Sequence, residues 1–249
     1  MKKIYVTTGF LATFLLASLT GFAQTQSRSD IQKQIEAKRA ELESLEQLYL
    51  APSEDDRADH AGFLQQPNTG LIRLLPREKF DSEMYKENKP TITMRGGGAY
   101  YSFARLTHEY GNGSDLSLER GVLQVGFAGA NYGFMTIIGD IPIETAGPET
   151  PGVTFFAAYK APGEEELARK EYHRLARGGE VHNMPVARSA PLQANTTYLL
   201  RSINYGTSDV LVVFRVVRVD SDGSAIIAWK LVKKYETPKF NRPEPKTVG

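Results

Sequence analysis

The chain has 249 residues, with 30 lysines and arginines, 29 aspartates and glutamates, and no cysteine. The absence of cysteine excludes disulfide bonds, thiolate metal sites and thiol catalysis. The balanced charge lacks the basic footprint of a nucleic-acid-binding protein, so we expect no nucleic-acid partner.

The first 23 residues have the order of a secretory signal peptide. Lys2 and Lys3 give a positive start, residues 4–19 carry no charge, and Ala23 is a small residue where cleavage is expected. The apolar run is shorter than the roughly 20 residues of a spanning helix, which disfavours the alternative of a permanent membrane anchor. We therefore predict cleavage near Ala23, an extracytoplasmic location (periplasmic or secreted), and no transmembrane segment in the mature chain.

Residues 24–50 predict a helix, because residues that favour helices dominate this stretch. Ser29 or Asp30 is expected to cap its start. Apolar side chains recur at coiled-coil positions, and Lys38 occupies one position of that pattern. The apolar positions are Ile31, Ile35, Leu42, Leu45 and Tyr49. Two interpretations remain open: a stalk that forms a homo-oligomer, or a single amphipathic helix packed on the protein's own domain.

Residues 51–70 are acidic and contain little to bury, so we expect an exposed linker. The carboxylates lack the spacing of a calcium-binding loop, which disfavours a calcium site. At the other end of the chain, residues 237–249 contain three prolines and few apolar residues. This composition predicts a flexible tail.

Residues 71–236 predict the main domain, an all-β, jelly-roll-like β-sandwich with one helical insertion. The insertion is expected at 164–177, where acidic residues precede basic ones and two glycines follow. The segment 210–219 is apolar on both faces, which predicts a central strand covered on each side. The expected strands are 71–75, 91–95, 99–106, 116–118, 122–127, 132–138, 153–159, 198–204, 210–219 and 225–235.

The loop after the expected strand 99–106 holds the main candidates for chemistry. His108, Glu109 and Asp115 are residue types that bind metals or exchange protons, with Arg105 or Tyr110 assisting. The pair His108-Glu109 begins like the H-E-x-x-H motif, but an asparagine ends it and nearby glycines disfavour the required helix. The alternative interpretation is a surface loop whose polar side chains only satisfy turns.

Two further patterns fail the context that their chemistry requires. The glycines at 96–98 precede a strand-like stretch and no helix, which favours a bulge or a strand corner over a phosphate site. Residues 206–210 begin like a G-x-S-x-G motif but lack its second glycine. The four histidines are scattered, and we expect no cofactor.

Aromatic residues offer a possible binding surface. Tyr100, Tyr101 and Tyr110 could stack on sugar rings, which would make a glycan or an envelope component the partner. The alternative is that these rings belong to the core, as alternating aromatic residues in strands usually do. Trp229 shares a strand face with Ile227, which favours burial.

The sequence as a whole favours an exported, non-enzymatic binding or structural module, oligomeric through residues 24–50. The rival hypothesis is a metal-dependent or general acid/base hydrolase built around His108, Glu109 and Asp115.

Overall fold

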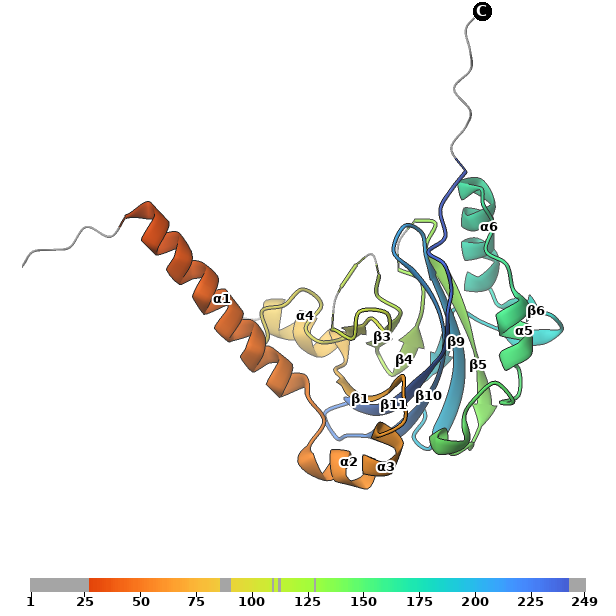
Figure 1. Ribbon diagram of the computed structural model, residues 1–249, viewed down its shortest axis with the longest axis horizontal. Coiled ribbons are helices and arrows are strands. Elements are labelled where there is room, and N and C mark those ends of the chain that lie inside the picture. The colour runs from red at the N-terminus through yellow and green to blue at the C-terminus, as the bar shows by residue number, and fades with distance from the viewer. Residues whose placement is uncertain (1–26, 86–90, 109, 112, 128, 242–249) are drawn as a thin grey trace, which may run out of the picture. The chain divides into compact units, whose positions relative to one another are not determined.

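The computed structural model describes residues 27–85, 91–108, 110–111, 113–127 and 129–241 (Figure 1). The predicted signal peptide, Glu109 and the last eight residues of the predicted tail lie outside this part. The chain divides into two units, residues 1–41 and 42–249, and the boundary falls inside the first helix.

The elements in chain order are α1 (Arg28–Leu50), α2 (Glu54–Asp59), α3 (Ala61–Leu64), β1 (Thr69–Leu74), α4 (Arg77–Tyr85), β2 (Tyr100–Tyr101), β3 (Leu116–Glu119), β4 (Val122–Gln124), β5 (Tyr132–Gly139), η1 (Ile143–Thr145), α5 (Val153–Ala158), α6 (Glu165–Ala176), β6 (Gly179–Val181), β7 (Met184–Val186), β8 (Ser189–Pro191), β9 (Thr196–Asn204), β10 (Ser208–Val219) and β11 (Ala225–Lys234). Among the described residues, no helix is both long enough and apolar enough to cross a membrane.

The main unit is rich in antiparallel sheet, as predicted, and none of its sheets is closed. Five strands form the largest sheet in the order β1-β11-β10-β9-β5, and four form a second sheet in the order β2-β3-β4-β8. Strands β6 and β7 pair as a separate ribbon. Strand β10 is central in the larger sheet, which confirms the position expected from its two apolar faces.

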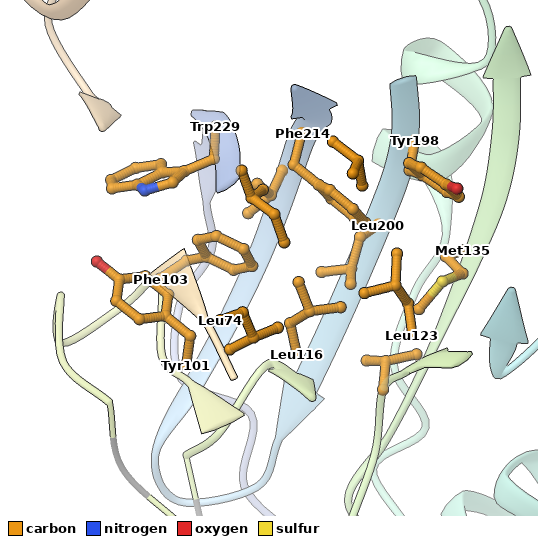
Figure 2. Close-up of a cluster of buried hydrophobic side chains, with 14 of the residues drawn as sticks. Leu74, Tyr101, Phe103, Leu116, Leu123, Met135, Tyr198, Leu200, Phe214 and Trp229 are labelled. Carbon is orange, nitrogen blue, oxygen red and sulfur yellow. The ribbon is translucent and has the colours of Figure 1, made fainter. Parts of the chain in front are cut away.

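Both faces of the five-stranded sheet are covered. One face packs against the second sheet through a core that includes Phe214, Trp229, Phe103 and Leu116, whose side chains converge in Figure 2. The opposite face packs against α5 and α6, which lie on the other side of the sheet from β3 and β4 (Figure 1). Helix α6 confirms the expected insertion, and Trp229 is buried as expected.

Two hairpins join consecutive strands that the sequence predicts. Strands β3 and β4 pair around Arg120 and Gly121, whose φ angles of 50° and 71° suit the tight turn. Strands β10 and β11 pair around residues 220–224, where the Asp220 amide N–H donates to the Ser224 carbonyl. Turn residues therefore located these connections correctly.

The expected strand 153–159 is wrong, because this segment forms the helix α5. Its run of apolar and aromatic residues fits a strand locally, but short apolar runs do not distinguish strand from helix. In the helix, Val153 and Phe156 are three residues apart and lie on one buried face. Helix α4 is a further helix that the sequence did not predict.

The expected strands 91–95 and 99–106 are largely absent, because side chains bind the backbone groups that a sheet would use. The Glu46 carboxylate accepts hydrogen bonds from the Thr93 and Met94 amide N–H groups. The Asp115 carboxylate does the same for the two residues that follow Ser102, so strand β2 ends at Tyr101. The glycines between the two segments form a turn, and at Gly97, where φ is +57°, a Cβ would lie 2.3 Å from the Phe80 ring.

The acidic segment 51–70, expected to be an exposed linker, contains two short helices. Ser53 and Asp56 form a capping box at the start of α2. The Asp56 carboxylate is buried and pairs with Arg218. Burial raises the pKa of Asp56, but hydrogen bonds from Arg218 and Ser53 outweigh it and hold that pKa below its usual value. The acidic composition of this segment did not predict its folded structure, because the partner of Asp56 lies far along the chain.

Both ends of the described chain also differ from expectation. Helix α1 begins at Arg28, and the Ser27 hydroxyl, not Ser29 or Asp30, accepts the Asp30 amide N–H. In the segment expected to be a flexible tail, Phe240 stacks on Tyr205 with ring centroids 3.9 Å apart. Residues 237–241 therefore pack on the domain.

Candidate functional site

His108 lies in a structural contact and not in an open site. Its Nε2 atom is 2.8 Å from the Arg73 carbonyl oxygen, and since a carbonyl only accepts, Nε2 donates the proton. The ring also meets the Tyr101 ring edge-on, with centroids 5.1 Å apart. Burial lowers the pKa of His108 to about 4. The imidazole is therefore neutral at physiological pH, and it provides a hydrogen-bond donor for one backbone carbonyl of strand β1.

Asp115 is completely buried and its oxygens are occupied. One carboxylate oxygen accepts the Phe103 amide N–H at 2.7 Å, and the other accepts the Asn204 side-chain amide at 3.0 Å. Burial raises the pKa of Asp115 to about 6, against the opposing effect of its hydrogen-bond donors. The side chain thus joins the loop after β2 to the end of β9, and it is inaccessible to a substrate.

The tyrosines proposed to bind sugars are mostly covered. Tyr100 and Tyr101 are buried, and the Tyr100 hydroxyl accepts a hydrogen bond from Arg77. The Tyr110 ring is partly exposed and lies under the Arg95 guanidinium, whose Cζ atom is 4.4 Å from the ring centroid. Neither Tyr100 nor Tyr101 presents a free ring face to a sugar. Among the described residues, no three acidic or histidine side chains lie close enough together to hold a metal ion.

The structure instead reveals a cleft beside α5 that the sequence did not predict. Its volume is about 680 Å³, and it lies between the segment 157–161 and the segment 235–239. Arg201 and Asp209 lie at its floor, and Tyr159, Lys160 and Lys239 contribute to its walls. We take this cleft as a candidate binding site.

The ion pair at the floor of the cleft is built by the hairpin between β9 and β10. In the register of the two strands, Arg201 is opposite Leu211 and Asp209 is opposite Ile203, so the charged residues are diagonal neighbours on one face. Arg201 donates from Nε and Nη2 to the two carboxylate oxygens at 2.5 and 2.9 Å. The third nitrogen, Nη1, donates to the Phe156 carbonyl at 2.9 Å and ties α5 to the sheet.

The surroundings of this pair are aromatic. The Arg201 guanidinium carbon lies 3.3 Å from the centroid of the Tyr235 ring, and Arg201 is only 1% exposed. Burial raises the pKa of Asp209, although the adjacent Arg201 opposes that shift. A carboxyl group with a raised pKa at the floor of a cleft is a common feature of functional sites.

A second polar network runs from the sheet to α6 beside the cleft. The Tyr132 and Tyr159 hydroxyls are 2.8 Å apart, and the Tyr159 hydroxyl donates to Glu171 at 2.9 Å. Glu171 in turn receives two hydrogen bonds from Arg174. Burial raises the pKa values of both tyrosines, so the hydroxyls remain protonated.

These groups define what the cleft can hold. The alanines of segment 157–161 suit an apolar body, while the ammonium groups of Lys160 and Lys239 suit a negative end. One sequence signal pointed to this site: an arginine stands in the middle of the apolar strand 198–204. Its aspartate partner follows the next turn, but nothing local showed which face the pair occupies.

Comparisons of the chain with protein-family models, with curated proteins and with solved structures found no match.

Proposed function

We propose that this protein is an exported, non-enzymatic β-sandwich module that binds or organises other molecules and is oligomeric through helix α1. The observation that carries the proposal is an exposed apolar stripe on α1. The stripe consists of Ile31, Ile35, Leu42, Leu45, Leu48 and Tyr49, whose residues are 39–69% exposed. Apolar side chains gathered on one face of a helix typically mark an interaction surface.

The C-terminal end of α1 is attached to the domain. The exposure of apolar residues there is therefore not the result of a detached helix. Leu50 is buried with Leu75 and Ile92 in a small core. The Glu46 carboxylate accepts hydrogen bonds from the Thr93 hydroxyl and from two backbone amides. The chain therefore fixes one flank of the last two turns of α1 and leaves Leu45 and Leu48 exposed.

The rest of the proposal has separate support. The two packed sheets favour a sandwich, and the charge and apolar pattern of residues 1–23 favours export. A module without cysteine suits an oxidising compartment, because it cannot form mispaired disulfides. The rival hydrolase hypothesis gains no support, because His108 and Asp115 serve structural hydrogen bonds. The cleft above Arg201 is the site that we propose for a small ligand.

The decisive experiment measures the mass of residues 24–249 in solution by light scattering. We expect an oligomer, and we expect Leu42→Ser/Leu45→Ser to shift it to the monomer. The matched control is Ala37→Ser/Ala40→Ser on the opposite side of the same helix, which should leave the mass unchanged. Deletion should remove only residues 24–41, because Glu46 and Leu50 belong to the folded domain. A monomeric wild-type chain would refute the oligomeric stalk.

A further inference from the structure

Resting on the proposed oligomeric function, we infer that α1 pairs with α1 of a second copy of this chain in the antiparallel direction. Lys38 is a charged residue at a position where the repeat places apolar residues, between Ile35 and Leu42. A single charged residue at such a position determines which direction and register two helices can adopt.

A parallel, in-register pair would place like charges against each other. Each stripe residue would face its own copy, so Lys38 would face the partner's Lys38 inside the interface. Two ammonium groups brought together and partly removed from water repel strongly. This arrangement is therefore disfavoured.

An antiparallel pair brings the five apolar positions Ile31, Ile35, Leu42, Leu45 and Tyr49 into contact without this conflict. When the helices run in opposite directions, residues of increasing number on one helix face residues of decreasing number on the other. A single register then pairs Ile31 with Tyr49, Ile35 with Leu45, and Lys38 with Leu42, each from opposite copies. No other antiparallel register of this repeat brings all six of these positions into contact.

The charges near the centre of this register complement one another. Within one helix the Lys38 ammonium already lies 2.6 Å from the Glu41 carboxylate, and both side chains are well exposed. In the antiparallel pair, the two lysines and two glutamates lie around the twofold axis in alternation. Each ammonium is then near both carboxylates, so the group has no net charge.

The flanks of the helix are consistent with this direction. The domain buries Glu46 and Leu50 at the end of α1 and leaves Leu45 and Leu48 exposed. Two like-charge contacts remain beside the twofold axis, Arg39 with its copy and Glu41 with its copy. The Lys38 ammonium 2.6 Å from Glu41 offsets the second contact. The first, between the two arginines, has acidic residues nearby. Glu36 and Glu43 are one turn away on the same helix, which moderates that repulsion.

Disulfide cross-linking tests the direction directly, because the natural chain has no cysteine to interfere. Two variants of residues 24–249 are made, Ile35→Cys and Leu45→Cys, with tags of different mass. Antiparallel pairing predicts that the mixture forms a disulfide-linked heterodimer after oxidation and that each variant alone does not. In that arrangement the two copies of position 35 are ten residues apart along the axis, about 15 Å, beyond the roughly 7 Å limit for a disulfide.

The outcomes separate this inference from the proposal beneath it. Efficient cross-linking of each variant with itself would show a parallel pair, which overturns the antiparallel direction and leaves the oligomeric stalk standing. A dimeric mass with no cross-link in any sample would place the interface elsewhere and overturn both. A monomeric mass would do the same. Ala40→Cys, on the far side of the helix, is the control that must not cross-link in any arrangement.

Discussion

The two faces of the five-stranded sheet are buried by different means. On the face toward the second sheet, side chains such as Trp229, Phe214 and Leu200 pack in an apolar core (Figure 2), and the buried Asp115 carboxylate accepts a hydrogen bond from Asn204 on this same face. On the face toward α5 and α6, apolar packing is interrupted by the buried pair of Arg201 and Asp209. Both faces thus combine apolar packing with a buried carboxylate, and on the face toward α5 and α6 that carboxylate is paired with a buried arginine.

On both faces, buried charged side chains hold irregular segments in place by hydrogen bonds to their backbone groups. On the face toward the second sheet, the paired strands supply their own backbone hydrogen bonds, and Asp115 binds the amides of the loop after β2. The other face is covered by a short helix, a loop and the C-terminal segment, whose carbonyl groups need donors. Arg201 and Tyr235 supply these donors to Phe156 and Ala157. The polar pair therefore orders the walls of the cleft.

The largest expected effect comes from removing one partner of the buried ion pair between Arg201 and Asp209. Arg201→Met leaves the Asp209 carboxylate buried without its partner, and we expect a loss of about 3–5 kcal/mol in the free energy of unfolding. Urea denaturation measures it. The double variant Arg201→Met/Asp209→Leu is the control and should recover most of the loss, because no buried charge remains. Equal losses in the two variants would show that packing, and not charge, is what Arg201 provides.

Neighbouring leucines of β9 compare the two faces directly. Leu199 and Leu200 are fully buried and point to opposite faces. Replacing either by alanine should cost about 2–5 kcal/mol in denaturation experiments, since each leaves a cavity. If Leu199→Ala cost less than about 1 kcal/mol, the face under α5 and α6 would not be a packed core.

Asp115 and His108 should give opposite pH dependences. The folded-state pKa of Asp115, about 6, lies above its usual value of 3.8, so its stabilising contribution is present at pH 4 and is lost as pH rises through 6. The expected loss is about 3 kcal/mol. The pKa of His108 is lowered from 6.5 to about 4, so its contribution is present above pH 6.5 and is lost toward pH 4.

The two contributions oppose each other between pH 4 and 6.5. We expect Asp115→Asn to make stability fall more steeply toward pH 4 than in the natural chain, and His108→Gln to make it rise. Urea unfolding midpoints measured across this range test the pair. Identical pH profiles for both variants and the natural chain would mean that neither group titrates as its burial implies.

The smallest effect is expected from a single hydroxyl. Tyr159→Phe removes the link between Tyr132 and Glu171 and should cost about 1–2 kcal/mol. Tyr198→Phe is the matched change on the face toward the second sheet, where the hydroxyl donates to the Pro191 carbonyl at 2.7 Å. A loss confined to Tyr198→Phe would show that the network beside α6 does not stabilise the fold.

The regular part of the fold was largely predictable. Strands β9, β10 and β11 have alternating or continuous apolar residues bounded by turn residues, and the register follows from those turns. Helix α6 has charges that match its dipole at both ends. The irregular segments were predicted poorly, because remote side chains decide their backbone. Glu46 and Asp115 each bind amides that local propensity assigned to strands.

The site was the least predictable part. His108 and Asp115 attracted attention because of their chemistry, but the fold gives them structural roles. Arg201 and Asp209 carry no motif, and their importance comes from burial.

The sequence by itself determined which segments form long strands, where α6 begins and ends, and that α1 carries an apolar stripe, because these depend on the spacing of residues along the chain. The tertiary structure showed which polar groups are buried together and that Leu45 and Leu48 at the end of α1 remain exposed. Burial and pairing depend on segments far apart in sequence, such as Asp56 with Arg218. Only the packed chain brings such partners within hydrogen-bond distance, and only there does a charge become costly without its partner.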